Sequence, residues 1–201
     1  MSNQLIMIFI RNPELGHVKT RLAKSIGNQA ALETYKILIK HTARIVNKTT
    51  ADKLIFYSEK IQKNDIWSEI NCQKQTQSNG DLGQKMLQAF QYGFSLGYKK
   101  VIIIGSDIYS LQSKHFKSAF EQLEHCDVVI GPALDGGYYL LGLNFMIPEI
   151  FTQKQWSTSS VLEETLTNLK EFNVKLLEPL NDIDTYEDLK KEPQLLKQLN
   201  I

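Results

Sequence analysis

Residues 99–111 read KKVIIIGSDIYSL. The apolar residues 101–104 stand between two lysines and a Gly-Ser-Asp turn, which predicts a strand buried on both faces. Such a strand would carry the carboxylate of Asp107 at its carboxyl end. An uncompensated charge at the edge of a core is costly, so Asp107 raises the question of what compensates it. A turn residue or a helix N-cap is the alternative role for this aspartate.

Further apolar segments repeat this pattern along the chain, and they predict strands over residues 5–10, 53–57, 127–131, 138–143 and 174–178. Segments with helical spacing lie between most of them. Strands that alternate with helices are typical of βαβ units and a mostly parallel sheet. We therefore predict an α/β fold, a three-layer α/β/α sandwich, formed by residues 1–201 as a single domain.

Two helices are predicted in more detail, over residues 81–97 and 160–172, because apolar residues recur on one face of each. Ser160 with Glu163, and Thr185 with Asp188, have the spacing of capping boxes that open helices.

The composition excludes several classes of protein. The 201 residues carry a formal net charge of +1, so no global field attracts nucleic acid or an anionic membrane surface. The two cysteines, Cys72 and Cys126, lack metal-ligand spacing and fit a reducing compartment. The apolar run at residues 5–10 is far shorter than a membrane span. We expect a cytoplasmic protein without a membrane span.

The loop after the first predicted strand, RNPELGHVKTRLA (11–23), places Arg11, Lys19 and Arg21 around the start of a helix. The spacing of a P-loop is absent. Backbone N–H groups, the helix dipole and fixed cations at such a position suit a phosphate group. Three solvated surface cations are the alternative.

Near the C-terminus, NDIDTYEDL (181–189) brings Asp182 and Asp184 to the start of a capped helix. Turn and cap roles would explain them, but the carboxyl ends of parallel strands converge. Asp107 and Asp184, with Asp182, could then share a hard divalent cation, Mg²⁺ or Mn²⁺. On this hypothesis Asp107 has no basic partner inside the protein.

Three other features have both a structural and a binding interpretation. Asp135, Gly136 and Gly137 form either a hairpin turn or a rim that contacts a nucleotide or sugar. Asp81 caps a predicted helix in a glycine-flanked loop of similar character. Trp156 is either a core aromatic or a platform for a ring.

Six segments together resemble one bacterial family over nearly the whole chain, and they read FIRNPELGHVKTRLA (9–23), QSNGDLGQKM (77–86), VIIIGSD (101–107), DVVIGPALDGGYYLLGL (127–143), QWST (155–158) and NDIDTYEDL (181–189). The family is the glycosyltransferase-like group labelled radical-SAM/selenodomain-associated transferases. It is similar to the nucleotide-diphospho-sugar transferases of the GT-A fold.

The resemblance implies a metal-dependent transferase that moves a glycosyl group from a nucleotide sugar to an unknown acceptor. It implies that Lys19 and Arg21 contact the phosphates, and that Asp107 with Asp184, and Asp182 beside it, holds the metal. A nucleotidyltransferase that releases pyrophosphate, and a silent nucleotide-sugar binding module, are the alternatives.

The resemblance also implies that Gly136 and Gly137 line the sugar or acceptor side. This chain departs from the family pattern at two places. Arg11 stands where the family usually has lysine, and Ile108-Tyr109 replaces the Cys-Pro that usually follows Asp107.

Overall fold

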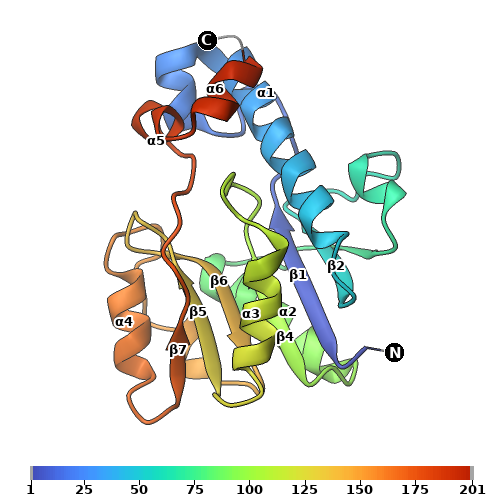
Figure 1. The fold of residues 1–201 in the computed structure, drawn as a ribbon, viewed down its shortest axis with the longest axis vertical. Coiled ribbons are helices and arrows are strands. Elements are labelled where there is room, and N and C mark those ends of the chain that lie inside the picture. The colour runs from blue at the N-terminus through green and yellow to red at the C-terminus, as the bar shows by residue number, and fades with distance from the viewer. Residues whose placement is uncertain (1, 200–201) are drawn as a thin grey trace.

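The computed structural model describes residues 2–199, and its strands form one seven-stranded sheet in the order β3-β2-β1-β4-β6-β5-β7 (Figure 1). The strands are β1 (Gln4–Ile10), β2 (Asp52–Tyr57), β3 (Gln73–Thr76), β4 (Lys100–Ile104), β5 (Val128–Pro132), β6 (Tyr138–Leu143) and β7 (Val174–Leu176).

The sheet is mostly parallel, as predicted. β1 runs parallel to β2 and β4, and β5 runs parallel to β7. β6 lies antiparallel to both of its neighbours, β4 and β5. The carboxyl ends of β1, β4 and β5 therefore lie at one edge of the sheet, and β6 begins at that same edge. In an open α/β sheet, ligands bind beyond this edge.

Helices cover both faces of the sheet, which confirms the three-layer α/β/α fold. The helices are α1 (Thr20–Val46), α2 (Leu82–Ser95), α3 (Ser113–Gln122), α4 (Val161–Asn168), α5 (Tyr186–Lys190) and α6 (Pro193–Leu199), with 3₁₀ turns η1 (Ile66–Glu69) and η2 (Pro148–Phe151). Alternate residues of β1 enter the two cores. Ile6 and Ile8 pack with α1 and α3, whereas Leu5 and Met7 pack with α2, α4 and η2.

A third, smaller core lies outside these layers. α1 is kinked at Gly27, which has φ 81° and ψ 158°. Leu22, in the segment before the kink, packs with Leu189 of α5 and Leu195 of α6. Figure 1 shows α5 and α6 beside the beginning of α1, beyond the carboxyl edge of the sheet. The start of α1 thus packs against the C-terminal helices.

The structure corrects one of the two predicted capping boxes. Thr185 caps α5 and forms the box with Asp188, as predicted. Ser160 has the helical angles φ −89° and ψ −10°, its side chain makes no cap hydrogen bond, and its hydroxyl donates instead to Glu164. The helix predicted to run to residue 172 ends at Asn168.

β3, with the sequence QKQT, was not predicted, because its polar and partly exposed residues carry no apolar pattern. Within residues 2–199, no helix has both the length and the apolar character needed to cross a membrane.

Candidate functional site

Residues 177–185, which we call the strap, connect β7 to α5 and run along the carboxyl edge of the sheet (Figure 1). Backbone hydrogen bonds tie its first part to β5. Further on, the N–H of Ile183 donates to the carbonyl of Asp107 at 3.0 Å. Ile183 is fully buried in the third core. The strap therefore holds Asp182 and Asp184 next to the end of β4.

Lys19 lies between the two aspartates that the sequence hypothesis pairs. Its Nζ is 3.2 Å from Oδ2 of Asp107 and 3.3 Å from Oδ1 of Asp184. The Lys19 side chain is 6% exposed, and the two carboxylates are 40% and 36% exposed. The expectation that Asp107 lacks a basic partner within the protein is therefore wrong. It failed because the loop after β1 folds over the end of β4.

The electrostatics of Lys19 follow from this position. Burial lowers the pKa of its amine, but the charges of Asp107 and Asp184 and their hydrogen bonds outweigh burial and raise the pKa above its ordinary value. Lys19 is therefore a fixed cation at neutral pH. Arg21, whose side chain is 66% exposed, adds a second cation, with Nη1 at 3.0 Å from Oδ2 of Asp184.

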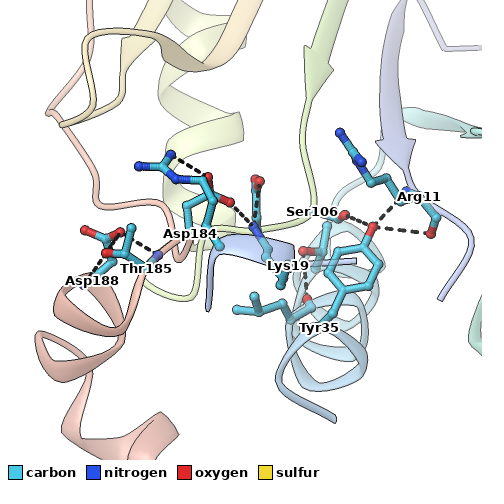
Figure 2. A network of polar contacts seen from close by, with 11 residues as sticks. Arg11, Lys19, Tyr35, Ser106, Asp184, Thr185 and Asp188 are labelled. Carbon is cyan, nitrogen blue, oxygen red and sulfur yellow. Dashed lines mark hydrogen bonds and ion pairs between the residues drawn. The ribbon is translucent and has the colours of Figure 1, made fainter. Parts of the chain in front are cut away.

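A glycine and a buried tyrosine shape the end of β4. A Cβ added at Gly105 would lie 2.8 Å from Oδ1 of Asp107, so glycine leaves room for this carboxylate. The Tyr35 hydroxyl accepts the N–H of Arg11 at 2.8 Å and lies 3.1 Å from the Ser106 hydroxyl (Figure 2). Burial raises the pKa of Tyr35, which stays protonated. This contact joins the ends of β1 and β4.

The Ile108-Tyr109 pair has its own anchors. The Ile108 side chain is buried in the core that contains Ile6 and Ile8. The Tyr109 ring lies 5.1 Å from the ring of His41, and its hydroxyl accepts a hydrogen bond from Gln198 at 2.9 Å. The turn after Asp107 is therefore fixed by α1 and α6 rather than by a proline.

Asp182 faces other carboxylates. Burial, and then the charges of Asp135 and Asp107, raise the pKa of Asp182 to about 6. Asp135 sits in the turn of the β5–β6 hairpin, where its Oδ1 accepts the N–H of Gly137 at 2.8 Å. The hairpin interpretation of residues 135–137 is confirmed, and the same turn places a negative charge toward Asp182.

The other predicted binding residues do not join the ion-pair cluster of Lys19, Arg21, Asp107 and Asp184. Asp81 is the N-cap of α2 and accepts the N–H of Gln84 at 2.8 Å. Trp156 is partly buried and packs closely on Gly83 in the first turn of α2. Gly136, with φ +94°, is pressed against the backbone of Ser159.

Other residues shape the edge without having been assigned from the sequence. Buried Asn12 accepts the backbone N–H of Glu59 at 3.0 Å and donates to the Lys60 carbonyl at 2.8 Å. The Gln77 amide donates to the carbonyls of Ile10 and Phe56. The sequence signal for each was only a polar residue that follows a strand, and its hydrogen-bond partners are distant in the sequence.

The donor set suits a hard cation in kind, because Mg²⁺ and Mn²⁺ prefer carboxylate oxygens. Within residues 2–199, however, no three His, Cys, Asp or Glu side chains come together closely enough to hold a metal ion. Both oxygens of Asp184 contact cationic side chains, whereas Oδ1 of Asp107 contacts neither Lys19 nor Arg21. The cation between the two carboxylates in this structure is the Lys19 ammonium.

Comparison with solved structures shows the same fold. A protein of Desulfovibrio desulfuricans G20, provisionally assigned as a nucleotide-diphospho-sugar transferase, is 29% identical over 99% of each chain, with a TM-score of 0.85. A CMP:2-keto-3-deoxy-manno-octonic acid synthetase solved with CTP is 11% identical over 98% of this chain and 99% of its own, with a TM-score of 0.61.

A nucleotidyl transferase of Methanothermobacter thermautotroptrophicus is 10% identical over 97% of this chain and 98% of its own, with a TM-score of 0.67. At such low identities, the likeness to the nucleotidyl transferase and to the synthetase shows the fold alone. No curated protein matches the sequence. The model of a family described as "Uncharacterized protein conserved in bacteria (DUF2064)" matches residues 41–158. This match covers more than half of the chain, which therefore belongs to that family.

Proposed function

We propose that this DUF2064 protein is a metal-dependent transferase that binds a nucleotide sugar and transfers its glycosyl group to an acceptor. One observation carries the proposal. Lys19, at the start of α1, and Asp107, just beyond the end of β4, meet Asp184 of the strap at the carboxyl edge of the sheet. The fold shared with the Desulfovibrio protein supports the substrate class.

The proposed roles follow the charges. Lys19 and Arg21 would bind the diphosphate and offset the negative charge that grows on it as the glycosyl bond breaks. Asp107 and Asp184, with Asp182, would hold Mg²⁺ or Mn²⁺. When bound, such an ion supplies further charge stabilisation to the diphosphate.

The remaining residues would bind the rest of the substrate. Asp135 and Gly137, at the β5–β6 turn beside Asp182, would face the sugar or acceptor, together with Gly136. Arg11, Asp81 and Trp156 would contact the nucleotide.

We also propose that residues 1–201 form one domain of the radical-SAM/selenodomain-associated type. A cytoplasmic location would keep Cys72 and Cys126, which are both free thiols, reduced.

A nucleotidyltransferase is the second candidate, because a solved nucleotidyl transferase shares the fold over nearly the whole chain. The same cations would then bind a nucleoside triphosphate, and a phosphorylated acceptor would attack its α-phosphate. The two reactions release different products. A nucleotide sugar gives a nucleoside diphosphate, whereas a nucleoside triphosphate gives pyrophosphate.

The test begins with a thermal-shift screen of nucleotides and nucleotide sugars, each with and without Mg²⁺ or Mn²⁺. A ligand at a hundredfold excess over its Kd stabilises by about 2.7 kcal/mol. The products of the best ligands are then analysed for the wild-type chain and for Asp107→Ala. We expect the wild type to release a nucleoside diphosphate only when metal is present, and we expect the variant to release none. Binding without any product, equal in both chains, would instead indicate a silent binding module.

A further inference from the structure

The ion pairs of Lys19 have an unusual arrangement of burial. The cation is almost completely buried, and each of the two carboxylates it joins is more than a third exposed. The acids therefore face solvent, and the ammonium lies behind them. An ion that arrives from solvent reaches the carboxylates first and then meets a positive charge behind them.

The backbone of Lys19 is also unusual. It has φ 47° and ψ 44°, in the left-handed region that residues other than glycine rarely adopt. Its neighbours hold it there. Val18 is 2% exposed, and the Lys19 carbonyl accepts the N–H of Ala23 at 2.8 Å as α1 begins. The loop therefore aims this one side chain toward Asp107 and Asp184.

This position puts Lys19 in competition with any divalent cation. Oδ2 of Asp107 and Oδ1 of Asp184 are the atoms that such a cation would take, and both now contact the ammonium. A doubly charged ion placed beside the ammonium would also be repelled by it. A phosphate group would remove this conflict, because it offers the lysine another anionic partner.

We infer that Lys19 is the resident counter-ion of the Asp107–Asp184 pair, and that a divalent cation binds tightly only when Lys19 has turned to another anion. The inference rests on the proposed function, since it assigns the metal to these acids. It implies that metal and diphosphate bind together rather than independently.

The direct test is Mn²⁺ binding to the full chain without any nucleotide, followed by the electron paramagnetic resonance signal of free Mn²⁺. Lys19→Met removes the charge and keeps an unbranched apolar side chain. We expect it to bind Mn²⁺ at least tenfold more tightly than the wild type does. Equal affinities in the two chains would overturn the inference.

Arg21→Met is the matched control. Arg21 also contacts Asp184, at 3.0 Å, but it is largely exposed and reaches only one of the two carboxylates. We expect this variant to change Mn²⁺ affinity less than threefold. A larger gain in Arg21→Met than in Lys19→Met would also refute a special role for Lys19.

A second measurement needs only the wild-type chain and does not depend on how a variant folds. Acetylation by acetic anhydride, read by mass spectrometry, should be at least tenfold slower at Lys19 than at Lys117, whose side chain is 79% exposed. Acetylation of Lys19 at a rate like that of Lys117 would count against the inference, because a lysine paired with two carboxylates cannot react as fast as an exposed one.

The product analysis separates this inference from the proposed function. If the wild type forms a nucleoside diphosphate but the wild type and Lys19→Met bind Mn²⁺ equally well, the counter-ion role of Lys19 is rejected. The proposed transferase function then stands. If the two chains differ tenfold in Mn²⁺ affinity but no nucleotide sugar or triphosphate gives a product, the counter-ion role of Lys19 stands. The proposed transferase function is then rejected.

Discussion

Replacing Asp182 with asparagine should stabilise the protein relative to wild type, and this gain should be larger at pH 7.5 than at pH 4. The pKa of Asp182 is raised to about 6 by burial and by the charges of Asp135 and Asp107. Folding therefore favours the protonated form of this side chain. The stability it contributes is fully present below its ordinary pKa of 3.8 and is lost as the pH rises through about 6.

The magnitude follows from the two pKa values. A difference of about two between the folded and the unfolded chain corresponds to about 3 kcal/mol. Asp182 is only partly buried, so solvent screening reduces this figure, and we expect about 1–2 kcal/mol. For a chain of this size, that corresponds to a gain of about 2–8 °C in the melting temperature of Asp182→Asn between pH 4 and pH 7.5, relative to wild type.

Thermal unfolding followed by circular dichroism from pH 4 to pH 8, without added metal, measures this gain. Asp188→Asn is the control of opposite sign. Burial raises the pKa of Asp188, but hydrogen bonds from Thr185 and contacts with Lys191 outweigh burial and lower it. Its stabilisation is present above pH 3.8 and is lost only as the pH falls below that value, so Asp188→Asn should be destabilised by nearly the same amount from pH 4 to pH 8. A difference between wild type and Asp182→Asn that stayed constant across this range would refute the clustering of the carboxylates.

Two further predictions concern the ion-pair cluster and the helix caps. Gly105→Ala places a methyl group 2.8 Å from the Asp107 carboxylate, so Asp107 should move and acetylation of Lys19 should become at least threefold faster; an unchanged rate would contradict this geometry. Thr185→Ala removes the cap of α5 and should cost about 1 kcal/mol in urea unfolding. Ser160→Ala should cost less than about 0.5 kcal/mol, because Ser160 forms no cap; equal losses in both variants would contradict the assignment of the caps.

The layers of the fold could be predicted from the sequence, because the buried strands are nearly continuous apolar runs. The exceptions have physical reasons. β3 lies at the edge of the sheet, where polar residues such as Lys74 replace the apolar pattern. β6 is buried like its neighbours, and an apolar run carries no sign of its direction. The interruption of α1 at Gly27, where φ is 81° and ψ is 158°, was not predicted either.

The site could be predicted in its parts but not in its pairing. Asp107, Asp184 and Lys19 were each singled out from local chemistry, as strand-end acids and a cation at a helix start. Their contacts join residues 88 and 165 positions apart along the chain. Local spacing carries no information about such distances. Lys19 also adopts a left-handed backbone that its residue type does not favour, so no propensity indicated where its side chain would point.

The balance of charge at this edge argues for a binding site rather than a structural ion-pair network. Lys19 and Arg21 compensate Asp107 and Asp184. Asp182 then adds a carboxylate that these ion pairs leave unneutralised, and its raised pKa means that it destabilises the fold at neutral pH. A network that only held the chain together would gain stability by losing this side chain. On the proposed function, this surplus of negative charge would bind a cation from solution, and Lys19 would bind the anion that arrives with it.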